Sequence, residues 1–342
     1  MISNIDKENF KKAWQRILSS DRILLVSHIN PDVDAISSLG VFSDILKSLG
    51  KKYFSFAENK NDNYDYIPHA EDIISSKEEL KNIINKNSEL GDKYLEYFDL
   101  IITFDCGSLE RTNLGSEIEL FKNKFVIEID HHVKVSSYAD IEIKIQLASN
   151  TEILYYFLEE NSIEINKNIA NCILSGILTD TGNFLYPSVK NETLKISSRM
   201  LSLGAQFPKI VNNTLRNKNF SDMKVWAIVL ENLRINEKYD IAFSFFTYED
   251  FQNIEKMNLE ISEDAFGLIV SFMSSLSEVS TVLLLKEEKM GEIKGNLRVG
   301  STDKDVDVAY LASFLGGGGH KKAAGFMMKG SLIQENDTLR IV

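Results

Sequence analysis

Four separated segments of this 342-residue chain each end an apolar run with acidic or histidine residues. The segments are 27–34, 104–107, 130–132 and 179–182. The runs at 23–26, 100–104 and 125–129 are short and almost continuously apolar, as strands buried on both faces are. This repeated pattern limits the fold more strongly than any other feature of the chain.

Helical patterns separate these apolar runs. Leu39, Phe42, Ile45 and Leu46 recur at helical spacing, and Gly50 is suited to end that helix. Strands alternating with helices predict an α/β fold, here an N-terminal doubly wound, mainly parallel sheet. Ligands of such sheets bind beyond the carboxyl ends of the strands, which is where the acidic and histidine residues fall.

Several of the acidic residues have a purely structural interpretation when taken alone, whereas the triplet at 130–132 is hard to explain in that way. Asp32 or Asp34 would serve as a helix N-cap, and Asp180 as a turn residue. Several carboxylates at one sheet edge would repel each other, however, unless cations were bound among them. We therefore predict two divalent metal ions, a device typical of phosphate-ester hydrolysis. Carboxylates with imidazole and no thiolate favour Mn²⁺, with Mg²⁺ as the alternative.

The overall charge limits the partners. A net charge of −12 argues against a protein that coats long DNA or RNA, because such proteins need a basic surface. Cys106 and Cys172 are too few and too isolated for a disulfide framework. The N-terminus lacks a signal-peptide pattern and no apolar run is long enough to span a bilayer. We expect a cytoplasmic protein that does not bind membranes.

The chain divides into two predicted domains. A catalytic domain covers 1–205, a helical linker 206–235 and a smaller C-terminal α/β domain 236–342. Ser221 and Asp222 are candidate caps for the linker helix. In the C-terminal domain we expect strands at 241–246, 279–286 and 292–299 and helices at 265–276 and 306–315.

A glycine run in the C-terminal domain is a second candidate site. Gly316 to Gly319 precede His320, and Arg298 lies on a predicted neighbouring strand. Glycine lets backbone approach a ligand closely, and arginine grips phosphate through paired hydrogen bonds. A flexible loop or tight turn is the alternative. We assign substrate binding to Arg298, Gly317, Gly318, Gly319 and His320.

The N-terminal motifs resemble those of the DHH phosphoesterase superfamily, named for the triplet found here at 130–132. The resemblance implies that His28, Asp32 and Asp105 hold one metal. It implies that a second metal is held by Asp34, Asp105, His131 and Asp180, with Asp105 bridging the two. His132 would contact the substrate phosphate, and Asp130 would orient an imidazole. Arg111 resembles a recurrent arginine of the family, and a surface salt bridge is an equal alternative.

The glycine run, with Ala323, Ala324 and Gly325, resembles the DHHA1 domain of one DHH subgroup. The whole pattern resembles the bacterial nanoRNase and pAp phosphatase group. That resemblance implies hydrolysis of very short RNAs such as the dinucleotide pApA, and of 3′-phosphoadenosine 5′-phosphate (pAp), in a cleft between the domains. Two alternatives stay open, a stand-alone cyclic di-AMP phosphodiesterase and a catalytically inactive nucleotide sensor. A homodimer is compatible with the sequence.

Overall fold

The short apolar runs form the central strands of a six-stranded parallel sheet. The predicted strands 23–26, 100–104 and 125–129 lie within β1 (Arg22–Val26), β4 (Leu100–Phe104) and β5 (Phe125–Asp130). The flanking strands are β2 (Lys52–Phe56), β3 (Ile73–Ile74) and β6 (Ile141–Lys144). Every residue of β4 is buried, as expected for a central strand covered on both faces. The predicted doubly wound sheet is therefore confirmed.

The strand order places the ends of β1 and β4 side by side. The order is β3-β2-β1-β4-β5-β6, with Val26 paired with Thr103 and Phe104 with Ile129. The order reverses at the β1–β4 pair, because β2 and β3 continue to one side and β5 and β6 to the other. In open α/β sheets a reversal of this kind opens a crevice at the carboxyl ends of the strands.

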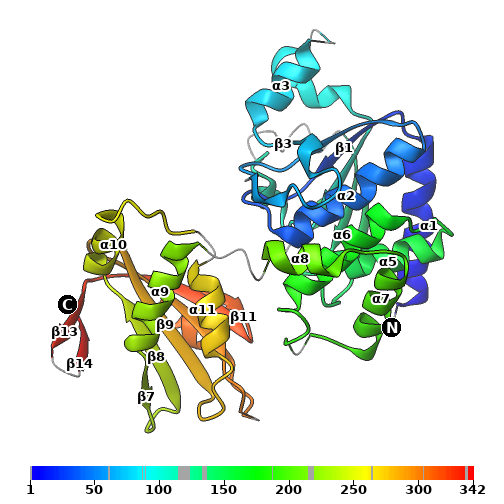
Figure 1. Ribbon diagram of the computed structural model, residues 1–342. Coiled ribbons are helices and arrows are strands. Elements are labelled where there is room, and N and C mark those ends of the chain that lie inside the picture. The colour runs from blue at the N-terminus through cyan, green and yellow to red at the C-terminus, as the bar shows by residue number, and fades with distance from the viewer. Residues whose placement is uncertain are drawn as a thin grey trace. The chain divides into compact units, whose positions relative to one another are not determined.

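Helices cover both faces of this sheet (Figure 1). One face packs against helices α1, α2 and α5, and α6 packs on α2 and α5 in the same apolar core. The other face packs against α3 and the 3₁₀ segment η3. The α-helices of this unit are α1 (Asn4–Ser19), α2 (Val33–Ser48), α3 (Lys77–Asn85), α5 (Asn150–Glu160), α6 (Lys167–Asp180), α7 (Asn191–Ser202) and α8 (Phe207–Thr214). Its 3₁₀ segments are η1 (Asp62–Tyr64), η2 (Ala70–Asp72), η3 (Gly91–Tyr97) and η4 (Leu109–Thr112).

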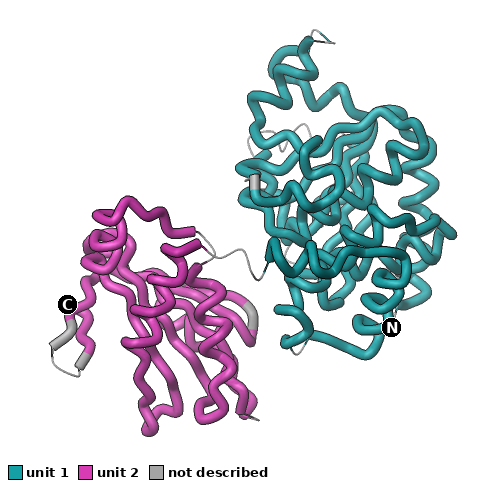
Figure 2. Tube along the Cα trace, viewed as in Figure 1, with its two compact units in different colours: residues 1–216 teal, residues 217–342 magenta. Residues whose placement is uncertain are grey.

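The chain forms two compact units, 1–216 and 217–342 (Figure 2). The computed structural model describes residues 2–60, 62–86, 88, 90–114, 124–132, 137–186, 188–214, 219–262, 265–302, 304–335 and 338–342. The second unit contains a mixed sheet in the order β11-β12-β10-β9-β8-β7 and a separate hairpin, β13-β14. The predicted smaller C-terminal α/β domain is thus a mixed-sheet domain.

The expected elements of the second unit are present with small shifts at their ends. Its strands are β7 (Arg234–Asn236), β8 (Ile241–Phe246), β9 (Thr281–Lys289), β10 (Glu292–Val299), β11 (Gly318–His320), β12 (Ala323–Lys329), β13 (Leu332–Glu335) and β14 (Thr338–Ile341). Its helices are α9 (Phe220–Glu231), α10 (Tyr248–Glu255), α11 (Ala265–Met273) and α12 (Val308–Ser313). Helices α9 and α11 pack on one face of the mixed sheet, and α12 packs on the other.

Residues 206–235, which the sequence assigned to a helical linker, are divided between the two units. Helix α8 belongs to the first unit, whereas Val225 and Val229 of α9 are buried in the core of the second. The predicted caps of this helix were wrong, because Asn219 is its N-cap. Asp222 instead accepts hydrogen bonds from the Ser262 backbone and hydroxyl, so that its carboxylate ties α9 to the segment before α11.

Both cysteines are buried, and neither takes part in a disulfide. Burial raises the pKa of the Cys106 thiol well above its ordinary value, which keeps that thiol protonated. Across the described ranges, the helices are all too short or too polar to cross a bilayer.

Candidate metal centre

Acidic and histidine side chains from four segments converge at the carboxyl end of the parallel sheet. The side chains form three groups, and within each group the candidate ligand atoms lie within 4.8 Å of one another. These groups are His28–Asp32–Asp105, Asp34–His131–Asp180 and Asp105–His131–His132. His131 Nε2 lies 3.2 Å from Asp105 Oδ1 and 3.4 Å from Asp180 Oδ2. The structure thus brings together every predicted metal-binding residue of the first unit.

The loop after β1 supplies His28 and Asp32. The hydroxyl of Ser27 donates to the Phe104 carbonyl at 2.9 Å, which ties the loop to the end of β4. His28 is buried, and its Nδ1 donates to the Ile29 carbonyl at 2.8 Å. This bond fixes the tautomer and leaves Nε2 as the atom that faces Asp32 Oδ2 at 3.9 Å.

Asp32 is a helix N-cap, as the sequence suggested, and it also belongs to the cluster. It is the N-cap of α2, and its Oδ1 accepts from the Ala35 backbone N–H at 3.0 Å. Its Oδ2 faces His28 and is left for a ligand. One carboxylate therefore fixes the start of the helix with one oxygen and takes part in the cluster with the other.

The N-terminus of α5 holds the Asp34 carboxylate. Asp34 Oδ2 accepts from the Asn150 backbone N–H at 2.6 Å. Its Oδ1 accepts from the Thr151 backbone N–H at 3.1 Å and from the Thr151 hydroxyl at 2.7 Å. A Cβ on Gly176 of α6 would lie only 2.1 Å from Asp34 Oδ1, so this carboxylate fits because residue 176 is glycine.

Asp105 has a backbone conformation that is unusual for a residue with a side chain. Its φ is +58°, in the left-handed region, at the point where the chain leaves β4. Its Oδ1 is buried and accepts no well-aligned hydrogen bond from the described residues, although His131 lies at ion-pair distance. Burial, reinforced by Asp32 and Asp34 and opposed by His131, raises the pKa of Asp105 to about 7.

Asp130 orients the neighbouring histidine. Asp130 Oδ1 accepts from the His132 backbone N–H and from His132 Nδ1, each at 2.8 Å. Its Oδ2 accepts from the Gly107 backbone N–H at 2.5 Å. Burial alone would raise the pKa of Asp130, but these hydrogen bonds lower it to about 2. Asp130 is therefore ionised, and it holds the His132 ring in one orientation.

These features fit divalent metal ions. Burial and neighbouring carboxylates raise the pKa of Asp180 well above its ordinary value, and burial raises that of Asp34. A divalent cation would remove this electrostatic conflict and would give the buried Asp105 oxygen a partner. Carboxylate oxygens and imidazole nitrogens are suitable ligands for Mn²⁺.

The predicted substrate-binding residues of the second unit also lie close together. Arg298 of β10 pairs with Ala323 of β12, which pairs with His320 of β11, so the three backbone positions form one row across the sheet. The N–H groups of Gly316 and Gly317 donate to the Ser313 and Ala312 carbonyls. Those two N–H groups are thus engaged within the unit. If the glycine run binds phosphate through its backbone, the N–H groups that do so are those of Gly318 and Gly319.

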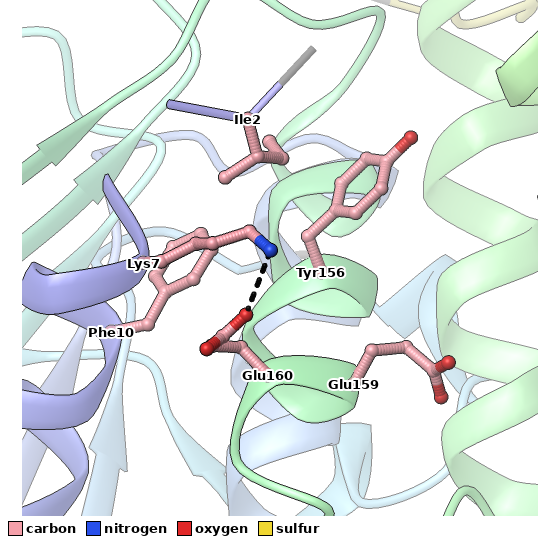
Figure 3. A pocket seen from close by; sticks show the side chains of 6 residues that line it. All are labelled: Ile2, Lys7, Phe10, Tyr156, Glu159 and Glu160. Atoms are coloured by element: carbon pink, nitrogen blue, oxygen red, sulfur yellow. Dashed lines mark ion pairs between the residues drawn. The ribbon is translucent and has the colours of Figure 1, made fainter. Parts of the chain in front are cut away.

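A pocket elsewhere in the first unit is separate from this cluster. It lies between the N-terminal region and α5, beside the Lys7–Glu160 ion pair (Figure 3). Its α5 residues, Tyr156, Glu159 and Glu160, belong to the C-terminal part of that helix. Asp34 is held at the other end of α5, so this pocket is not the candidate site.

Comparisons with known proteins agree with the cluster. Residues 22–177 match the DHH family, N-terminal domain, and residues 252–340 match the DHHA1 domain. The chain belongs to the DHH/DHHA1 phosphoesterases. This family uses divalent metal ions. The matched ranges contain all of the candidate residues except Asp180, which follows the first range by three positions.

Individual relatives of this DHH/DHHA1 chain are distant but match it along nearly their whole length. The uncharacterised protein MG371 of Mycoplasma genitalium is 24% identical, with 100% of this chain and 96% of the relative covered. A probable bifunctional oligoribonuclease and PAP phosphatase, NrnA of Streptococcus mutans, is 26% identical, with 92% of each covered. An exopolyphosphatase-related protein of Bacteroides fragilis has a similar structure, with a TM-score of 0.79, 28% identity and 95% and 92% coverage.

Sequence reasoning missed the residues that hold Asp34. Asn150 and Thr151 lie 116 and 117 positions beyond it and carry no charge. A signal for the helix start was present, because Ser149 is followed by Glu152 before an apolar run. Ser149 does cap α5, but the motif gives no indication that the helix N-terminus points at a metal ligand.

We expect Thr151→Val to weaken Mn²⁺ binding about tenfold, because residues that orient metal ligands typically contribute tenfold to a hundredfold. Valine keeps the shape of threonine but removes the hydroxyl that donates to Asp34 Oδ1. Titration calorimetry of the metal-free protein with Mn²⁺ measures the change. Thr151→Ser keeps the hydroxyl and should restore most of the affinity; equal weakening in both variants would assign the effect to packing instead.

Proposed function

We propose that this phosphoesterase hydrolyses very short oligoribonucleotides, dinucleotides such as pApA among them, to mononucleotides and dephosphorylates pAp. The observation that carries the proposal is the single cluster formed by all seven candidate residues His28, Asp32, Asp34, Asp105, His131, His132 and Asp180. The Streptococcus mutans relative, a probable bifunctional oligoribonuclease and PAP phosphatase, supports the substrate class.

The first unit would hold two divalent metals. His28, Asp32 and Asp105 would bind one, and Asp34, Asp105, His131 and Asp180 the other. When bound, such ions supply Lewis-acid stabilisation of negative charge at the phosphoryl group. Asp130 would keep His132 oriented toward a phosphoryl oxygen, and α5 would keep the Asp34 carboxylate in place. Mn²⁺ is the ion that we propose, with Mg²⁺ as the alternative.

The second unit would select short substrates. We assign to Arg298, Gly318, Gly319 and His320 the binding of a phosphate remote from the reacting one; Gly317 is left out because its N–H donates to the Ala312 carbonyl. Remote contacts that position the reacting group favour ligands of one length. The net charge of −12 agrees with this selection, because long nucleic acid would gain little from an acidic surface. Binding of substrate between the two units stays a prediction.

Product analysis of the Mn²⁺-loaded protein with pApA, pAp and cyclic di-AMP in parallel tests the proposal. Hydrolysis of pApA and pAp with cyclic di-AMP intact is the expected result. Rapid opening of cyclic di-AMP would identify a cyclic dinucleotide phosphodiesterase. Retention of nucleotide without any product would identify a sensor that has lost catalysis.

We expect Arg298→Ala to raise KM for pApA about tenfold or more, since a charge-assisted hydrogen bond contributes roughly 1.5–3 kcal/mol. Steady-state kinetics on the Mn²⁺-loaded protein measure this effect. Arg234→Ala is a matched control, because Arg234 lies on the edge strand β7 of the same sheet, three strands away from β10. An unchanged KM in the Arg298 variant would exclude Arg298 from substrate binding.

A further inference from the structure

Arg111 lies beside the candidate metal centre with its backbone fixed. It belongs to η4, six residues after Asp105. Its carbonyl accepts from the Ile29 backbone N–H at 2.7 Å, and its own N–H donates to the Ser108 carbonyl at 3.3 Å. The bond from Ile29 connects the loop that follows β1 with the loop that follows β4, and the bond to Ser108 is local to the second of these loops. The position of Arg111 is therefore set by the same loops that carry His28, Asp32 and Asp105.

The guanidinium group of Arg111 shares a small space with His132. The point that a Cβ would occupy on Gly107 is 3.2 Å from Arg111 Nη1 and 3.9 Å from His132 Cγ. Gly107 has a φ of +68°, so a left-handed turn without a side chain separates the two groups. The Arg111 charge and the His132 ring thus flank the same glycine at the edge of the cluster.

No carboxylate among the described residues neutralises Arg111. Its side chain is exposed, and it forms no ion pair within the part of the chain that the structure describes. The adjacent Glu110 carboxylate accepts instead from its own backbone N–H and from Ser108, which lower its pKa. The surface salt bridge that the sequence left open is therefore absent from these residues.

The guanidinium of Arg111 is available to an anionic ligand at the edge of the cluster. It is exposed and lies beside Gly107, whose backbone N–H donates to Asp130. The planar guanidinium can donate two parallel hydrogen bonds to phosphate oxygens.

We infer that Arg111 is a substrate-binding residue that contacts an oxygen of the reacting phosphate, on the side of the cluster where His132 lies. This inference rests on the proposed function, because it assigns a residue to the same phosphoester site. It gives the first unit a phosphate contact of its own, independent of Arg298. The ligand class is a phosphate monoester or diester group, whatever nucleoside carries it.

The test compares Arg111→Gln, Arg111→Lys and the control Arg22→Gln in the full-length chain. Arg22 lies at the amino end of β1, the opposite end of the same sheet. Calorimetry of the Mn²⁺-loaded proteins measures binding of AMP, adenosine and inorganic phosphate, and kinetics measure KM for pApA. Mn²⁺ affinity is measured separately without nucleotide.

For Arg111→Gln we expect AMP and phosphate to bind at least about tenfold more weakly and KM for pApA to rise similarly. Adenosine and Mn²⁺ binding should not weaken. Arg111→Lys should retain part of the phosphate affinity, because it keeps the charge but loses the paired donors. Arg22→Gln should behave as the wild type. A merely structural role for Arg111 would instead weaken Mn²⁺ binding or lower stability.

Unchanged AMP and phosphate affinity in Arg111→Gln would overturn the inference. So would a wild-type protein that binds neither AMP nor phosphate. The proposed function can fail separately. If the wild type hydrolyses no short RNA or pAp but binds phosphate through Arg111, the inference stands and the substrate assignment is wrong.

Discussion

Asp105→Asn is expected to abolish metal-dependent phosphoester hydrolysis while leaving the fold intact. Asp105 takes part in two of the three groups of candidate ligands. Under the proposed assignment it holds both metals, so its loss should affect both. Even residues that only orient a ligand typically contribute tenfold to a hundredfold, so we expect turnover to fall by more than about a hundredfold. Asparagine has the size of aspartate and adopts left-handed φ values readily, which suits the φ of +58°.

The same substitution should change how the stability of the metal-free protein depends on pH. The pKa of Asp105 is about 7 in the folded protein, above its ordinary value of 3.8. The folded state therefore holds this proton more tightly than the unfolded state, and stability falls as the pH rises from about 4 to about 7. Without the ionisable group, the Asn variant should lose less stability over this range. Urea unfolding at several pH values measures the difference.

Asp21→Asn is the matched control for Asp105→Asn. Asp21 is exposed and lies just before β1, at the opposite end of the sheet. Activity, Mn²⁺ stoichiometry and pH dependence should all stay as in the wild type. Wild-type turnover in the Asp105 variant, with full Mn²⁺ binding, would show that the cluster is not the catalytic centre.

Gly176→Ala is expected to damage both the packing of the first unit and the metal centre. The added Cβ would lie 2.1 Å from Asp34 Oδ1 and 2.3 Å from Thr151 Oγ1, far inside van der Waals contact. Either α6 must move away from α2 and α5, or the Asp34 carboxylate must leave its hydrogen bonds. Overpacking of a core typically costs about 1–3 kcal/mol of unfolding free energy. We expect that loss together with Mn²⁺ affinity lowered by about tenfold or more.

Gly267→Ala is the control, because Gly267 is also a helical glycine but has open space at its Cβ. Alanine in a helix interior is favoured over glycine by about 1 kcal/mol, so this variant should be as stable as the wild type or more stable. Urea unfolding and Mn²⁺ titration compare the two variants. Equal stability and equal Mn²⁺ affinity in the two variants would show that the close approach of α6 to Asp34 affects neither folding nor metal binding.

The sequence predicted the sheet and the ligand cluster because both rest on local patterns. A short apolar run that ends in acidic or histidine residues marks a buried strand together with its carboxyl end, and parallel strands bring those ends together. The pattern therefore located Asp105 and His131 at one edge without any knowledge of the strand order.

The contacts that refine the site depend on distances between helices, which local patterns do not contain. In the sequence, Gly176 is indistinguishable from any other small residue of an apolar helix. In the structure, its missing Cβ allows α6 to approach Asp34 closely. The caps of α9 were misassigned for a similar reason. Asp222 resembles an N-cap, but its preferred partner is Ser262, 40 residues away. Hydrogen bonds between distant positions of the chain compete with local capping, and here they prevail over it.

The division of the chain into two units places the proposed metal ligands and the proposed remote phosphate contacts in different domains. All candidate metal ligands fall between residues 28 and 180, within the first unit, whereas Arg298 and the glycine run belong to the second. The second unit also has apolar cores of its own. Under the proposed assignment, substitutions in the second unit would change phosphate binding and leave the metal ligands themselves in place. We therefore expect differences in substrate range among relatives to arise mainly in residues 217–342.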